Sequence, residues 1–223
     1  MAKTNPKDGA VILADEQYAG RGQSGNVWEA EPLKNLTFSI IYHTGFLGAS
    51  EQFYLNMAVS LGLQGSVEGC LEHTPETRIK WPNDIYVKDR KIAGILIENI
   101  IQGTHLSKSI IGIGLNVNQE FFPDPIRATS LLLENKAAAN KTEVLKNILE
   151  RIEYYFLELR NGNLEELKKT YLEKLYRMQE WHSYSDKNGT FQGKIRGISP
   201  YGNLQIETGK GIREYGMKEI QYE

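Results

Sequence analysis

The chain has 223 residues, 40% of them hydrophobic and 24% charged, which is the balance of an ordinary globular protein. A formal net charge of −2 argues against a polyanion-binding surface that covers the whole fold. The single cysteine, Cys70, excludes an intrachain disulfide and a thiolate-rich metal site, and it fits a reducing cytoplasm.

Hydropathy along the chain indicates neither a membrane span nor a secretory signal. No stretch approaches the roughly 20 consecutive apolar residues that cross a bilayer. Residues 1–6 lack the apolar core of a signal peptide. We therefore expect a cytoplasmic protein that has no membrane partner.

The first half of the chain alternates strand-like runs with turn residues. We predict strands at 9–14, 36–42, 78–81, 85–87, 91–101 and 109–118. The apolar spacing of residues 50–63 predicts a helix, with Ser50 as its N-cap. Pro82 ends one strand, and residues 88–90 form a hairpin turn between two others.

The second half begins with a predicted loop, residues 121–140, which contains Pro123 and Pro125. An apolar stripe predicts a long amphipathic helix at 142–160, and a second helix runs from Asn163 to about residue 178. Residues 184–223 are short apolar runs broken by glycine, which predict a small β-barrel. We place a domain boundary near residue 180, between residues 1–180 and 181–223.

The first candidate site is a glycine-rich segment after the first strand, Gly20-Arg21-Gly22-Gln23-Ser24-Gly25-Asn26-Val27-Trp28. Its glycines let the backbone approach a ligand and present N–H groups to an anion, and Arg21 adds a planar cation. The segment lacks the Gly-Lys-Ser/Thr of a Walker A loop and the strand–loop–helix setting of a Rossmann fingerprint. Taken alone, it is equally consistent with a flexible surface turn.

Two further segments carry charges at strand ends. In Lys80-Trp81-Pro82-Asn83-Asp84, the proline pushes a carboxylate to the end of a strand, where it would hold a metal-bound phosphate or orient a cation; the alternative is a simple turn. In Lys91-Ile92-Ala93-Gly94-Ile95-Leu96-Ile97-Glu98, a lysine opens an apolar strand and would neutralise a developing phosphate charge. The alternative is an exposed lysine at a hairpin end.

These three segments, followed by Gly112-Ile113-Gly114-Leu115-Asn116-Val117-Asn118, resemble the biotin–protein ligase family in order and spacing. The match runs from about residue 9 to 120, and the glycine-rich tail is similar to the family's C-terminal SH3-like domain. The resemblance implies an α+β fold: a mixed central β-sheet flanked by helices, of the class II synthetase-like biotin/lipoate ligase type, with a small SH3-like β-barrel.

The same resemblance implies a two-step reaction. The carboxylate of biotin attacks the α-phosphate of Mg²⁺-bound ATP, which gives biotinyl-5′-adenylate and pyrophosphate. A lysine on the biotin carboxyl carrier domain of a carboxylase then takes the biotin. Because the first step joins two anions, cations must offset their repulsion. A glycine-rich loop that orders over the water-labile intermediate loses about 1–2 kcal/mol per residue in entropy, which ligand contacts must offset.

The resemblance also implies residue roles. Catalysis would fall to Lys91, Arg21, Asp84 and Lys80. Biotin would be bound by Gln17, Gly20, Arg21, Gly22, Gln23, Lys91, Gly94, Leu96, Gly112 and Gly114. ATP would be bound by Arg21, Asn26, Trp28, Asn83 and Asn116. No metal ligand is assigned.

Two features depart from the family pattern. The family carries a Ser-Thr-Asn motif upstream of the first matched strand, followed by a helix, whereas here Thr4-Asn5 is followed at once by residues 6–9. We therefore expect the chain to start downstream of that motif. In addition, Gln23 stands where many members have a second arginine, so the loop has one cation fewer.

Other functions stay open from the sequence. A lipoate–protein ligase shares the fold, and a non-catalytic ligand-binding module fits the departure near the N-terminus. A biotin-responsive repressor would need a winged-helix domain and a basic helix, and the sequence offers neither, so we expect no nucleic-acid partner. A homodimer is one option for the oligomeric state.

Overall fold

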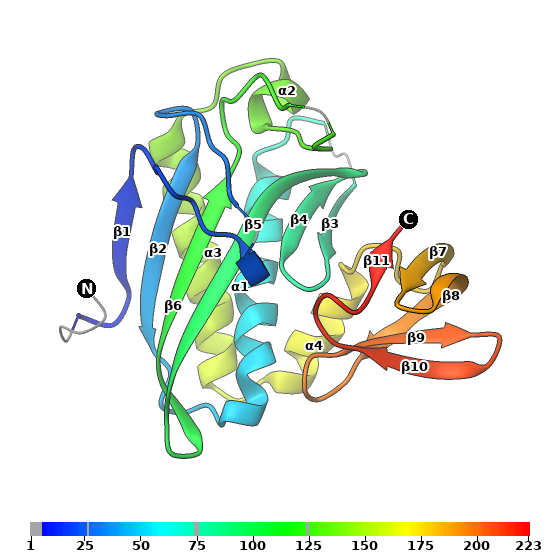
Figure 1. Cartoon of the computed structure of the whole chain (residues 1–223). Coiled ribbons are helices and arrows are strands. Elements are labelled where there is room, and N and C mark those ends of the chain that lie inside the picture. The colour runs from blue at the N-terminus through cyan, green and yellow to red at the C-terminus, as the bar shows by residue number, and fades with distance from the viewer. Residues whose placement is uncertain (1–5, 26, 74–75, 124) are drawn as a thin grey trace.

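The computed structural model describes residues 6–25, 27–73, 76–123 and 125–223, so Thr4, Asn5 and Asn26 lie outside the described residues (Figure 1). A six-stranded sheet has the order β1-β2-β6-β5-β4-β3. Its strands are β1 (Ala10–Ala14), β2 (Leu36–His43), β3 (Thr77–Lys80), β4 (Asp84–Val87), β5 (Arg90–Gln102) and β6 (His105–Leu115). Neighbouring strands pair antiparallel, and parallel pairing occurs at isolated bridges such as Ile79–Leu175.

Helices α1 (Gln52–Gly69) and α3 (Lys141–Arg160) cover one face of this sheet (Figure 1). Side chains alternate between the two faces along a strand, so Phe38, Ile40 and Tyr42 of β2 point to the helices and are buried. The Tyr42 ring stacks on Phe156 of α3, with ring centroids 3.8 Å apart. None of the helices within the described ranges combines the length and the apolar character that spanning a membrane requires.

The C-terminal part forms a second, five-stranded antiparallel sheet of order β10-β9-β8-β7-β11. Its strands are β7 (Trp181–Asp186), β8 (Gly189–Ile198), β9 (Leu204–Thr208), β10 (Gly211–Tyr215) and β11 (Gln221–Tyr222). The indole N–H of Trp81 donates to the carbonyl of Gly202 over 2.9 Å, which ties this sheet to the end of β3. The chain therefore ends beside β3 and β4 (Figure 1).

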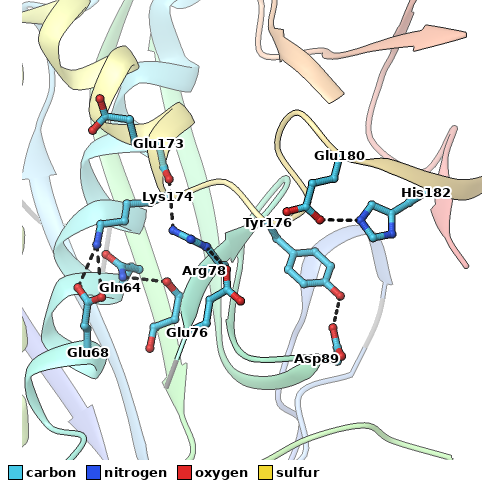
Figure 2. Close-up of polar contacts among 11 residues, drawn as sticks. Gln64, Glu68, Glu76, Arg78, Asp89, Glu173, Lys174, Tyr176, Glu180 and His182 are labelled. Carbon is cyan, nitrogen blue, oxygen red and sulfur yellow. Dashed lines mark hydrogen bonds and ion pairs between the residues drawn. The ribbon is translucent and has the colours of Figure 1, made fainter. Parts of the chain in front are cut away.

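Polar contacts hold the connection between α4 (Leu164–Glu173) and β7 against the rest of the protein (Figure 2). Lys174 pairs with Glu68 of α1 at 3.1 Å, and the Arg78 guanidinium donates to the carbonyl of Glu173. The hydroxyl of Tyr176 donates to Asp89 in the β4–β5 turn. These contacts fix the C-terminal sheet relative to β3 and β4.

Four predicted boundaries were wrong. Helix α1 runs on to Gly69, and Ser50 is not its cap: a short 3₁₀ turn, Ala49–Glu51, precedes it, and the Glu51 carboxylate accepts from the Gly48 N–H. The predicted 121–140 loop contains a short helix, α2 (Leu131–Asn135), whose Leu133 N–H donates to the hydroxyl of Ser130.

The other two errors concern where regular hydrogen bonding starts and stops. Strand β6 begins at His105, because a tight turn joins it directly to β5, and it ends at Leu115, where its pairing with β5 and β2 ends. Helix α4 ends at Glu173 rather than near 178, because the next backbone groups bond to β3 instead. The Ile79 N–H donates to the Lys174 carbonyl, and the Tyr176 N–H donates to the Ile79 carbonyl. Tertiary pairing with β3 thus overrides local helix propensity.

The α1–α3 contact gives a stability prediction. A Cβ at Gly62 would lie 2.7 Å from the Ile152 Cα, whereas a Cβ at Gly65 would lie 3.1 Å from the flexible end of Arg151. We expect the free energy of unfolding in urea to be about 1–3 kcal/mol lower for Gly62→Ala than for the matched control Gly65→Ala. The reason is that only Gly62→Ala forces two helix backbones apart. Equal stabilities would contradict the close packing.

Candidate active site

The face of the six-stranded sheet that lies away from the helices is hollowed by glycine. Gly94 of β5 pairs with Gly114 of β6, which in turn pairs with Thr37 of β2. Gly112 lies two residues along the same strand and pairs with Leu96 and Ser39. Residues two apart share a face, and these glycines carry no side chain to fill it. The result is a cavity of about 340 Å³ on the open face.

The glycine-rich segment belongs to the connection that leads from β1 to β2 in the chain, and this connection crosses the open face of the sheet (Figure 1). Its two ends are closed by a hydrogen bond of 3.0 Å from the Trp28 N–H to the Gly20 carbonyl. A Cβ on Gly20 would lie 2.1 Å from the Trp28 carbonyl oxygen, so this close approach requires glycine. The loop thereby forms the outer wall of the cavity, with Gly22 and Gln23 among the lining residues.

Two cations line the cavity, each held by a carboxylate. The Arg21 guanidinium makes two hydrogen bonds, of 3.2 and 3.0 Å, to Glu98. The Lys91 ammonium lies 2.7 Å from the Asp84 carboxylate. The Arg21 side chain is 72% exposed, so its ion pair with Glu98 is weak and easily exchanged. The Lys91 side chain is 32% exposed, so water screens its ion pair with Asp84 less.

The two cations lie at opposite ends of the cavity. Lys91 is next to Gly94, since its Nζ would lie 3.3 Å from a Cβ there, while Arg21 binds Glu98 four residues further along β5. Gly94 and Glu98 are about 13 Å apart along the strand, at about 3.3 Å per residue. The sequence names both cations, and the structure adds their carboxylate partners, Glu98 and Asp84.

The indole of Trp28 lies over the glycine floor between the strands. A Cβ on Gly114 would approach the ring to 2.3 Å, and Lys91 Nζ lies 5.6 Å from the ring centroid. The indole N–H is buried and has no hydrogen-bond partner among the described residues. A buried donor of this kind is suited to an acceptor on a ligand.

Trp28 and Lys91 also line a second cavity, of about 560 Å³. Its walls come from residues 27–32 and from the segment after β6, including Phe121, Phe122 and Asn116. The Asn116 amide donates to the Thr129 carbonyl over 3.0 Å, while its Oδ1 is buried and unpartnered among the described residues. The two cavities therefore meet at Lys91.

The segment after Pro82 is fixed by β5. The amide of Asn83 donates to the Ile95 carbonyl over 2.6 Å, and the Ile95 N–H donates back to the Asn83 carbonyl over 2.9 Å. This pair of bonds holds the side chain of Asp84 toward Lys91, because Asp84 follows directly in the chain. The hydrogen bonds of Asn83 thus position the Asp84 carboxylate, which a simple surface turn would not do.

Most residues with predicted binding roles line the first cavity: Gln17, Arg21, Gly22, Gln23, Trp28, Asn83, Asp84, Lys91, Gly94, Leu96, Gly112 and Gly114. Asn116 lines the second. Gly20 supports the loop without lining either cavity. Asn26 lies outside the described residues.

Lys80 is also absent from both linings. Its ammonium donates to the Tyr86 hydroxyl over 3.1 Å and lies 4.9 Å from the ring centroid of Tyr222. Lys80 therefore points toward the C-terminal sheet, and burial lowers its pKa from the ordinary lysine value.

Sequence reasoning missed part of the lining. Thr37, Ser39 and Ile41 of β2 and Glu98 of β5 all face the first cavity. The alternation of Thr37 and Ser39 with large apolar residues was a usable signal, because polar residues at every second position of a strand mark its solvent or ligand face. Nothing local marked Glu98, since its role depends on Arg21 from a distant segment.

Within the described parts of the chain, no three histidine, cysteine or acidic side chains gather as a metal site would require. The cavity instead contains single carboxylates, Asp84 beside Lys91 and Glu98 beside Arg21. This donor set suits Mg²⁺ that arrives on a polyphosphate, because such Mg²⁺ takes one or two carboxylates and completes its shell with phosphates and water.

Residues 1–116 match the model of the Biotin/lipoate A/B protein ligase family, and residues 185–217 match the Biotin protein ligase C terminal domain. The chain belongs to the biotin/lipoate A/B protein ligase family. The bifunctional ligase/repressor BirA of Bacillus subtilis is 31% identical over 99% of this chain and 68% of its own length. The biotin–[acetyl-CoA-carboxylase] ligase of Mycobacterium tuberculosis is 34% identical over 70% of this chain and 57% of its own.

A solved structure of similar fold is the biotin protein ligase from Aquifex aeolicus in complex with biotin and ATP. It superposes with a TM-score of 0.79 at 29% identity, over 99% of this chain and 92% of that protein. This likeness and the family matches confirm the predicted fold class. The family's ligase chemistry is also in keeping with two adjoining cavities that meet at a lysine.

The contact between Trp28 and the glycine floor is testable without a ligand. In a Trp181→Phe background, we expect Gly114→Ala to displace the Trp28 ring and shift tryptophan emission to the red, because the new methyl group would occupy the ring's place. Gly112→Ala is the matched control, since its Cβ would lie 3.5 Å from the Leu96 carbonyl, an ordinary contact. Identical spectra for the two variants would contradict the placement of the indole.

Proposed function

We propose that this protein is an ATP-dependent biotin–protein ligase that forms biotinyl-5′-adenylate and transfers the biotin to a lysine of a biotin carboxyl carrier domain. The observation that supports this most directly is Lys91, which lines both cavities and lies 2.7 Å from Asp84. Two substrates bound in adjoining cavities would meet at this ammonium group.

Biotin fits the cavity over the glycine floor. Flat backbone at Gly94 and Gly112, beside the Trp28 indole that covers Gly114, leaves room for a fused ring system, and Leu96 and Gln17 supply apolar and amide contacts. Arg21 lies at the end away from Lys91, so its guanidinium is suited to a carbonyl on the ring, while the carboxylate of the biotin tail extends to Lys91. Gly22 and Gln23 would cover the ligand.

The nucleoside of ATP fits the second cavity. Trp28 offers a ring face there, and the unpartnered Oδ1 of Asn116 offers an acceptor for an amino or hydroxyl group. Asn83 would contribute by holding Asp84 near the phosphates. Mg²⁺ would enter with ATP, with Asp84 as its protein ligand, which frees Lys91 for the reacting groups.

In the first step, a carboxylate oxygen of biotin attacks the α-phosphorus of ATP. The bond from that phosphorus to the oxygen that bridges to the β-phosphate breaks, and pyrophosphate leaves with the electron pair. Lys91 offsets the repulsion between the two anions and stabilises the charge that develops on the α-phosphate. The glycine-rich loop, when ordered over the product, keeps water from the mixed anhydride.

In the second step, a neutral lysine amine of the acceptor attacks the acyl carbon of the adenylate. The bond from that carbon to the phosphate oxygen breaks, AMP leaves, and the nitrogen loses a proton as the amide forms. A lipoate ligase is not favoured, because the Mycobacterium tuberculosis relative and the solved Aquifex aeolicus structure described above are named as biotin ligases. Calorimetric titration with biotin and with lipoate separates the two.

The decisive assay incubates the protein with biotin, Mg²⁺-ATP and an acceptor carrier domain, followed by streptavidin blotting. Labelled acceptor supports an enzyme; binding of biotin without labelling supports the alternative of a non-catalytic ligand-binding module and would overturn the proposal. Lys91→Met should lower the rate of adenylate formation about 10²–10³-fold, because it removes a charge at the reacting centre. Lys88→Met, in the exposed turn beside it, is the matched control and should retain the wild-type rate.

Gln23 gives a second prediction. Its amide lies 2.7 Å from the sulfur of Met217, so the tip of the loop reaches the segment between β10 and β11. We expect Gln23→Arg to slow the escape of biotinyl-adenylate, because a longer cationic side chain adds attraction to the bound phosphate. The measurement is the dissociation rate of preformed adenylate in a chase experiment; an unchanged rate would refute the idea.

A further inference from the structure

The glycine floor of the first cavity is short along the strands, and one of its ends lies at Lys91. Gly94 of β5 pairs with Gly114 of β6, and the Lys91 ammonium would lie 3.3 Å from a Cβ on Gly94. Two residues further along β5, Leu96 pairs with Gly112, the last glycine of β6 on this face in that direction. The floor therefore has a cation at one end and runs along the strands away from it.

The next row of the sheet closes the floor with large side chains. Glu98 of β5 pairs with Ile110 of β6, and Ile110 also pairs with Ile41 of β2, so the three lie side by side across the sheet. Each lies two residues beyond its neighbour in the preceding row, so all three share the open face, and all three line the first cavity. A ligand that lies along the glycine floor therefore meets a wall at this row.

The glycine-rich loop is tied to the same row. The Arg21 guanidinium, which also lines the first cavity, makes two hydrogen bonds to the Glu98 carboxylate, at 3.2 and 3.0 Å. The loop itself is closed at its ends by the hydrogen bond from the Trp28 N–H to the Gly20 carbonyl. The ion pair thus joins the loop to the sheet at the row of the two isoleucines and completes the wall with polar groups.

Lys91 and this wall are two fixed points on the path of one ligand. The row of Gly94, beside Lys91, and the row of Glu98 are about 13 Å apart along β5, at about 3.3 Å per residue. In the proposed function, the carboxylate of biotin is held at Lys91 and its ring lies toward Arg21. The protein then sets the length of an acid that contacts Lys91 and still fits within the wall.

We propose that Glu98, Ile110 and Ile41, with Arg21 paired to Glu98, form an end wall that selects the substrate by the distance between its ring and its carboxylate. A longer chain would press the ring against the wall and push the carboxylate past the Lys91 ammonium, whereas a shorter chain would leave one of the two contacts unmade. One methylene group more or less in an apolar pocket changes kcat/KM by roughly 10–200-fold. The inference rests on the proposed function for the orientation of the ligand.

The test compares biotin with homobiotin, whose chain is one methylene longer, and with norbiotin, whose chain is one methylene shorter. The measured quantity is kcat/KM for formation of the acyl-adenylate by the full chain, followed through release of pyrophosphate. We expect the wild type to prefer biotin to both analogues by about tenfold or more. Ile110→Ala moves the wall back and should raise homobiotin to at least the level of biotin. Ile110→Phe moves the wall forward and should favour norbiotin over biotin.

Two further variants separate the wall from a general effect of substitution. Ile101→Ala is the matched control, because Ile101 is 55% exposed near the β5–β6 turn and lines neither cavity, so it should keep the wild-type order of substrates. Glu98→Ala removes a partly exposed member of the wall and should shift the preference toward homobiotin, as Ile110→Ala does. It provides the same test if Ile110→Ala does not fold. A loss of stability alone would not shift the preference in opposite directions for the two Ile110 variants.

Equal kcat/KM for biotin and homobiotin in the wild type, or Ile110 variants that keep the wild-type order, would overturn the inference, while adenylate formation from biotin would still support the proposed function. If the wild type forms no adenylate, the proposed function fails, and calorimetric titration of the three acids without ATP tests the wall. Tighter binding of biotin than of homobiotin, reversed in Ile110→Ala, would then support the wall. Absence of that preference, or of biotin binding altogether, would overturn it.

Discussion

The ion pair between Lys91 and Asp84 is the interaction on which the rest of the site depends. It lies where two cavities meet, and both partners are held by rigid elements: Lys91 by β5, and Asp84 by the hydrogen bonds of Asn83 to the backbone of Ile95. A lysine that is paired at rest and exchanges its carboxylate for substrate anions gives a reaction centre that needs little reorganisation. In the proposed division of labour, Asp84 would hold Mg²⁺ and Lys91 would hold the acyl phosphate.

Glycine explains why a sheet offers a binding site at all. An ordinary strand would fill its open face with side chains, but Gly94, Gly112 and Gly114 leave that face flat, and the Trp28 ring rests on it. The same residue lines both cavities. The helices cover the opposite face of the sheet, where buried residues of β2 pack against them (Figure 1).

The sequence predicts the elements whose signals are local and fails where tertiary contacts decide. The apolar stripe of α3 and the β-branched and aromatic residues of β2 were sufficient to find those elements. Helix α4 stops early because Ile79 bonds the backbone groups of Lys174 and Tyr176 that would continue it. Family motifs located most of the cavity lining. They did not reveal that Arg21 pairs with Glu98 at the far end, nor that Gln23 contacts Met217, because both pairings join segments that are distant in the chain. The domain boundary near residue 180 stays a prediction.

The account stands or falls on what Lys91 contacts when substrates are bound. The direct measurement is a crystal structure of the full chain with biotinyl-5′-adenylate, or with biotin and a non-hydrolysable ATP analogue. We predict that the Lys91 ammonium leaves Asp84 and lies within hydrogen-bond distance of both the acyl oxygen and the α-phosphate, with the nucleoside beside Trp28 and Asn116. A structure in which Lys91 stays on Asp84 while the phosphate binds elsewhere would contradict it.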